Sequence, residues 1–149
     1  MQKLKLHPIT DTPKRNRFCG PSALSAITGL STGECAATIR RLTGRRNIMG
    51  TSEGELSEAL SELGYCFIDS YHKRYGGKAK TRPTIAAWLK MSIPDRKPGR
   101  LFLIEAGNHW QIVMGRKFTC GRIRDIVSIK DKRVPRRARV RGVYEVIKK

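Results

Sequence analysis

The fold is constrained most by two apolar segments in the second half of the chain, which a short turn joins. Residues 100–105 read Arg-Leu-Phe-Leu-Ile-Glu, a nearly continuous apolar run of strand length. Ala106-Gly107-Asn108 then turns the chain, and residues 109–114, His-Trp-Gln-Ile-Val-Met, run back as the next strand. We therefore expect this pair of strands in the middle of a sheet, with an antiparallel arrangement.

Helical patterns fill the first half of the chain. Apolar residues recur at helical spacing in three segments, residues 20–30, 31–43 and 51–63. The third segment opens with Ser52 and Glu55, which have the spacing of a capping box. A fourth, shorter helix is expected after Pro83-Thr84.

Further strands are expected at residues 65–68, 122–129 and 139–147. Helices followed by strands predict an α+β fold, with N-terminal helices packed on a C-terminal antiparallel β-sheet. A chain of 149 residues fits a single domain, residues 1–149. Within it, residues 1–15 are expected to form an N-terminal arm, and residues 130–149 a basic segment within the sheet.

One cysteine lies where the first helix is expected to begin. Cys19 directly precedes Gly20-Pro21, and proline is well tolerated in the first turn of a helix. Free backbone N–H groups and the positive end of the helix dipole converge on such a position. We expect this environment to lower the pKa of the Cys19 thiol and to favour the reactive thiolate.

The segment 16–29 around Cys19, taken with residues 107–115, resembles the papain-like cysteine peptidase superfamily. The similarity is greatest to its compact members that process bacteriocin leader peptides. In these proteins a cysteine opens the first helix, a histidine begins a late buried strand, and the next strand carries an acid. The resemblance implies that Cys19 is the nucleophile, His109 the base and Asp125 the third member of a triad, with Asp131 as the runner-up.

Three more positions complete the expected site. The glutamine that holds the oxyanion in the family has no counterpart here, and Asn16 is the candidate donor in its place. Trp110 is expected to pack over His109 or in the core, beside the cleft. Gln111 is a candidate cleft residue because strand alternation places it on the same face as His109.

The chain carries a large excess of positive charge. Thirty-one Lys and Arg residues stand against 12 Asp and Glu, which gives a net charge of +19. Charge of this size disfavours compact folding and is typical of proteins with a polyanionic partner, so DNA or RNA is a candidate partner. The candidate binding residues are Arg133, Arg136, Arg137, Arg139 and Arg141. Alternate arginines on a last strand would form a stripe for a nucleic-acid backbone, or would protect an edge strand against aggregation.

The cysteine spacing and the lack of long apolar runs exclude several classes of protein. The four cysteines show no Cys-x-x-Cys spacing, so neither a metal site nor a cofactor is expected. No apolar run reaches the length of a membrane span, and the first residues lack the apolar core of a signal peptide. We therefore expect a cytoplasmic protein. Its small size and high charge suggest a phage-encoded protein, in the host cytoplasm or the virion.

Two functional hypotheses follow from the sequence. The leading one is a papain-like cysteine hydrolase that cleaves a peptide, isopeptide or amide bond of a protein or peptide substrate through an acyl-enzyme on Cys19. The alternative is a non-enzymatic, strongly basic protein of phage or virion that associates with nucleic acid on the same fold.

Overall fold

A computed structural model describes residues 4–11 and 18–149, with the backbone alone at residues 69–72. Three helices come first: α1 (Cys19–Thr28), α2 (Thr32–Thr43) and α3 (Glu53–Glu62). The elements that follow are β1 (Tyr65–Arg74), the 3₁₀ helix η1 (Ala79–Thr81), α4 (Ile85–Met91), β2 (Leu101–Ala106), β3 (His109–Met114), β4 (Lys117–Cys120), β5 (Val127–Ser128) and β6 (Val140–Lys148).

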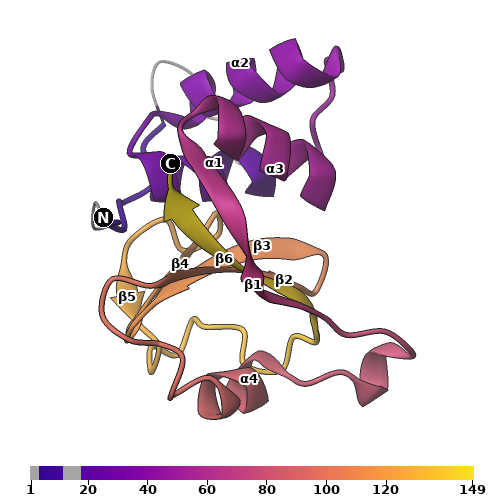
Figure 1. The fold of residues 1–149 in the computed structure, drawn as a ribbon, viewed down its shortest axis with the longest axis vertical. Helices are drawn as coiled ribbons and strands as arrows, with labels where there is room; N and C mark the ends of the chain where they lie inside the picture. Colours follow the sequence, from indigo (N-terminus) through magenta and orange to yellow (C-terminus); the bar gives the residue numbers. More distant parts are fainter. Residues whose placement is uncertain (1–3, 12–17) are drawn as a thin grey trace.

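The described strands form one sheet of six strands in the order β1-β6-β2-β3-β4-β5, and each neighbouring pair is antiparallel. Helices α1–α3 cover one face of this sheet, and α4 lies on the other (Figure 1). The α+β class and the antiparallel sheet are thus confirmed. No helix among the described residues is both long and apolar enough to cross a bilayer.

Local residues define several helix ends, and the predicted capping box is present. Ser52 and Glu55 form the capping box at the start of α3, with each side chain bonded to the other residue's backbone N–H. Gly29 and Gly44 close α1 and α2 in the left-handed conformation that glycine adopts without strain.

The central hairpin β2–β3 closes in two residues. Gly107 and Asn108 have φ values of 58° and 57°, as a type I′ turn requires at both central positions. This turn sets the register, so that Ala106 pairs with His109 and Leu101 pairs with Met114. His109 therefore stands at the very end of the sheet, where two strands meet.

Strand alternation divides the interior into two cores. Trp110 and Ile112 belong to the core beneath α1–α3, whereas Val113 belongs to the core on the α4 side. His109, Gln111 and Val113 are alternate residues of β3, so their side chains leave the strand on the same face, the α4 side.

The N-terminal arm is packed along α1 and α2 as far as it is described. Leu6 and Ile9 are buried, and the N–H of His7 donates to the carbonyl of Ala26 at 2.9 Å. Asp11 forms an ion pair with Arg124, and both side chains are largely buried. The arm is therefore joined to the loop between β4 and β5.

The structure corrects three expected boundaries. β1 continues to Arg74, because its polar second half pairs with β6 at the edge of the sheet. Only Val127–Ser128 of the expected strand 122–129 is extended in the sheet. Of the basic segment 130–149, only Val140–Lys148 lies within the sheet. Residues 129–139 instead form turns, because they bring Val134 into the core on the α4 side.

We expect the substitution Gly20→Ala to destabilise the protein by about 1–3 kcal/mol, the usual cost of overpacking a filled core. A Cβ atom at residue 20 would lie 2.2 Å from Oγ1 and 2.7 Å from Cβ of Thr51, so α1 would have to shift. The free energy of unfolding in urea measures this cost.

Gly54→Ala is the matched control, because Gly54 lies in α3 and its Cβ would have no atom within 4 Å. This change should stabilise the protein by up to about 1 kcal/mol, since alanine favours a helix more than glycine does. Similar effects of the two substitutions would contradict the close approach of α1 to Thr51.

Candidate active site around Cys19 and His109

Cys19 is the first residue of α1, as the sequence predicted, and its side chain is half-buried. The helix packs over β3 and β4, and residues 20–27 are all buried. Phe18 occupies the N-cap, and its side chain has no hydrogen-bond acceptor to offer the first turn. The N–H groups of that turn are therefore not capped from position 18.

Contacts among Trp110, Thr51 and Gly20 position the start of α1 over the sheet. Trp110 is 2% exposed, and its indole N–H donates to the carbonyl of Thr51 at 2.9 Å. The Thr51 side chain donates to the carbonyl of Ile48 and fills the space that a side chain at Gly20 would need. Strand β3, the loop before α3 and the start of α1 therefore meet at one point.

The Cys19 sulfur faces backbone donors. The backbone N–H groups of Trp110, Cys19 and Gly20 lie near enough to it to favour the thiolate and to lower the pKa of the thiol. Trp110 is free for this role because β4 pairs with β3 only from Gln111 onward, so the outward N–H of Trp110 lies beyond the end of β4. The thiol thus lies against the residue that follows His109.

The pKa of the Cys19 thiol is nevertheless raised above its ordinary value. Burial is the largest cause and raises the pKa by disfavouring the charged form. The three N–H groups lower it without offsetting burial, and the negative charge of Glu105 raises it further. The direction is opposite to the one that the sequence predicted from the helix start alone.

His109 begins β3 and is half-buried, and its ring lines a cavity of about 180 Å³ together with Gln111, Arg122 and Arg133. Its Nε2 atom is buried and meets no hydrogen-bond partner among the described residues. Among the residues that the structure describes, no hydrogen bond joins the His109 imidazole to the Cys19 thiol. The thiol and the imidazole therefore approach the Trp110 backbone from opposite faces of the sheet, and the ring is turned toward the cavity.

The pKa of His109 is lowered, first by burial and then by the positive charge of Arg122. Both causes favour the neutral imidazole at neutral pH. Because the Cys19 thiol is also favoured in its neutral form, the resting pair is a thiol and a neutral base.

Gln111 lines the same cavity and is 1% exposed. Its side-chain N–H₂ group donates to the carbonyl of Ala106 at 2.9 Å, whereas Oε1 meets no partner among the described residues. An unpaired acceptor and an unpaired imidazole nitrogen thus lie two residues apart on one face of β3. The expectation that Gln111 and His109 share a face agrees with the cavity that both line.

The structure does not bring either candidate aspartate to the His109 ring. Asp125 is exposed in a bend between β4 and β5. Asp131 accepts hydrogen bonds from the Arg133 guanidinium at 3.0 and 3.1 Å, and these bonds lower its pKa to about 2. The charge of Asp125 also acts on Arg133. Arg133 borders the cavity, so an arginine stands where the sequence predicted a carboxylate. Asn16, the candidate oxyanion donor, lies outside the described residues.

The five candidate arginines do not form a stripe on the last strand. Arg133 and Arg136 lie in the turns before β6, where Arg136 donates to the carbonyl of Ile129 at 2.8 Å. Arg139 donates to the carbonyl of Arg82 at 2.9 Å. Only Arg141 belongs to β6. The reason is the turn-rich path of residues 129–139, which the sequence pattern did not indicate.

Glu105 and Thr51 contribute to the site, and the sequence did not indicate either residue. Glu105 is the next-to-last residue of β2, pairs with Trp110 across the hairpin and has the parity of the helix-facing core. A charged residue in an otherwise apolar run was the available signal. Thr51 gave no signal, because only the approach of α1 assigns it a role.

Comparisons of the chain with protein-family models, with curated proteins and with solved structures found no match. The geometry of the site is therefore the basis for assigning a function.

We expect Glu105→Gln to lower the pKa of the Cys19 thiol, because it removes a negative charge that raises this pKa. The rate of Cys19 alkylation by iodoacetamide, followed across pH by peptide mass mapping, should reach its midpoint at a lower pH. Glu58→Gln, which removes an exposed carboxylate of α3, is the control and should leave the midpoint in place. A midpoint that stays or rises in Glu105→Gln would rule out Glu105 as a neighbour of the thiol.

Proposed function

We propose that the protein is a papain-like cysteine hydrolase that cleaves a peptide, isopeptide or amide bond through an acyl-enzyme on Cys19. One observation carries the proposal. A thiol at the start of a buried helix lies against the N–H of Trp110, the residue directly after a half-buried histidine.

In this proposal His109 is the general base. The mechanism requires the His109 side chain to leave the cavity and to move past the open end of β4 to the helix face, where a ring nitrogen meets the thiol. The neutral imidazole then accepts the Sγ proton. The sulfur then attacks the carbonyl carbon of the substrate. The imidazolium returns the proton to the leaving amine, so that a thioester remains on Cys19. Water, deprotonated by the same imidazole, hydrolyses the thioester and restores the thiol.

The N–H groups around the sulfur supply the electrostatic part of the mechanism. Those of Cys19, Gly20 and Trp110 come from the backbone of a helix and a strand, so their positions are fixed before substrate binds. A tetrahedral intermediate on the sulfur places its oxygen beside this group of donors. This backbone site supports oxyanion binding by itself, and Asn16 would add a side-chain donor.

Gln111 is the group best placed to orient the imidazole. Its amide is anchored through the bond to Ala106, which leaves Oε1 as a fixed acceptor in the cavity behind His109. The cavity has room for a water molecule that connects Oε1 to the ring. Asp125 and Asp131, both engaged near Arg133, are less suited to this role.

The proposal predicts that a peptide vinyl sulfone labels Cys19 of the wild-type protein and that His109→Ala slows labelling by roughly 100- to 10,000-fold, the usual contribution of a general base. Intact-mass spectrometry measures the rate, and Cys19→Ala should give no adduct. His72→Ala is the histidine control and should react like the wild type. Equal rates in His109→Ala and wild type, with both proteins folded by circular dichroism, would reject His109 as the base.

The role of Gln111 is tested in the same assay. Gln111→Met keeps the volume of the side chain and removes the acceptor, so vinyl sulfone labelling should slow. Alkylation by iodoacetamide at high pH, where the thiol needs no base, should be unaffected. An unchanged labelling rate in Gln111→Met would exclude Gln111 from the mechanism.

A second candidate function is association with nucleic acid. Arg137 and Arg141 are exposed, and neither guanidinium forms an ion pair with a carboxylate among the described residues. With a net charge of +19, such groups favour contacts to phosphates.

This candidate predicts that a mixed-sequence single-stranded oligonucleotide binds and that affinity falls steeply with salt. Each of Arg137→Ala and Arg141→Ala should reduce the slope of log affinity against log salt by about 0.7, the value for one phosphate contact on a single strand. Fluorescence anisotropy measures the slope, with Cys19→Ala as the control that should change nothing. Unchanged slopes in both arginine variants would exclude this surface as the binding site.

A further inference from the structure

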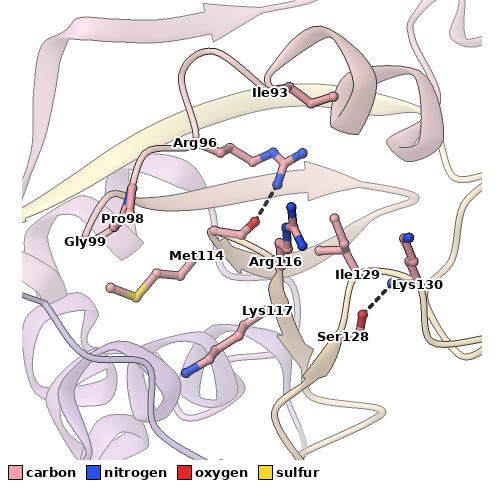
Figure 2. A pocket seen from close by; sticks show the side chains of 11 residues that line it. Ile93, Arg96, Pro98, Gly99, Met114, Arg116, Lys117, Ser128, Ile129 and Lys130 are labelled. Carbon is pink, nitrogen blue, oxygen red and sulfur yellow. Dashed lines mark hydrogen bonds between the residues drawn. The ribbon is translucent and has the colours of Figure 1, made fainter.

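A second concavity lies at the opposite end of the central hairpin from the Cys19 site. Its volume is about 890 Å³, and it is lined by the loop after α4, the β3–β4 turn and the chain around β5 (Figure 2). Strand β3 runs from His109 to Met114, so its two ends are separated by about 17 Å at 3.3 Å per residue. We call this concavity the basic groove, after the four cations that line it: Arg96, Arg116, Lys117 and Lys130.

The lining of the basic groove contains no carboxylate. None of its four cations forms an ion pair with a carboxylate among the residues that the structure describes. The groove is therefore a concentration of uncompensated positive charge in a partly enclosed space, where charges are screened less than on an open surface.

Hydrogen bonds hold the positively charged Arg96 guanidinium in a fixed position in the groove. Its guanidinium donates to the carbonyl of Gly115, shown as a dashed line in Figure 2, and to the carbonyl of Leu89 at 2.8 Å. Its Nε–H donates to the Ser92 hydroxyl at 2.9 Å. Burial, and after it the charge of Arg116, lowers the pKa of Arg96. Two like charges are thus held near each other, and an anion in the groove would relieve their repulsion.

The rest of the lining is aliphatic and indicates what kind of anion fits. Ile93, Pro98, Met114 and Ile129 border the groove, and Ile93 is 65% exposed. No aromatic side chain lines the groove, whereas single-stranded nucleic acids are held mainly by bases stacked on aromatic rings. Aliphatic surface between cations instead complements a chain that carries both carboxylates and aliphatic side chains.

We propose that the basic groove is a docking site for an acidic peptide segment of a protein partner, in which leucine-like side chains alternate with carboxylates. The carboxylates meet Arg116, Lys117 and Lys130, and the aliphatic side chains cover Ile93 and its neighbours. This proposal goes beyond the hydrolase function, since it uses no residue of the Cys19 site and holds whether or not Cys19 is catalytic.

Fluorescence anisotropy with a labelled peptide of alternating glutamate and leucine tests the proposal, in a Cys19→Ala background so that no cleavage interferes. The triple variant Arg116→Glu, Lys117→Glu, Lys130→Glu should weaken binding by about tenfold or more, a loss of at least about 1.4 kcal/mol. Its matched control is Arg46→Glu, Lys78→Glu, Lys80→Glu, which reverses the same number of charges at exposed positions outside the groove lining and should leave the affinity nearly unchanged.

Two further measurements identify the ligand class. Ile93 is exposed, so Ile93→Ser should not disturb folding. This substitution should weaken binding of the glutamate–leucine peptide and leave the affinity for a glutamate–serine peptide unchanged. An oligothymidine of similar length should be insensitive to the groove triple variant. The proposal is overturned if the peptide does not bind, if both triple variants lose affinity equally, or if the groove variant weakens oligothymidine more than peptide.

Discussion

The hydrogen bond from the Trp110 indole to the Thr51 carbonyl joins the helical half of the molecule to the sheet. Trp110 lies near the end of the central hairpin, and Thr51 lies in the loop that α1 approaches so closely that only glycine fits at residue 20. This contact fixes where the start of α1 lies over β3. The position of the Cys19 sulfur, and hence every chemical statement about it, depends on this contact.

The hairpin adds the second constraint. A two-residue type I′ turn puts His109 at the first position of β3, and the outward N–H of Trp110 lies just beyond the end of β4. The thiol and the imidazole therefore approach the same short stretch of backbone from the two faces of the sheet. Burial then favours the neutral form of both groups. In the proposed hydrolase, this pair would therefore act by general-base activation of the thiol at the moment of attack, rather than as a standing ion pair.

The elements of this fold could be predicted from local signals. The Ser52–Glu55 capping box, the glycines that end α1 and α2, and the apolar run before Gly107-Asn108 each act within a few residues. Cys19 at a helix start followed from Gly20-Pro21 for the same reason. The ionisation of Cys19 could not be predicted, because burial and Glu105 come from packing partners that are distant in sequence. The sequence also did not predict that Asp125 lies in a bend, or that residues 129–139 form turns and leave four of the five candidate arginines before β6, because these turns accompany the burial of Val134 against distant parts of the chain.

The central claim is that Cys19 and His109 act as one unit across the end of the hairpin. The most direct measurement is a crystal structure of the protein with a peptide aldehyde bound to Cys19 as a thiohemiacetal. The account predicts the hemiacetal oxygen within about 3 Å of at least one of the Cys19, Gly20 and Trp110 N–H groups, with a His109 ring nitrogen at hydrogen-bonding distance from the adduct. An adduct whose oxygen meets none of these donors, with the His109 ring still turned toward Gln111, would contradict it.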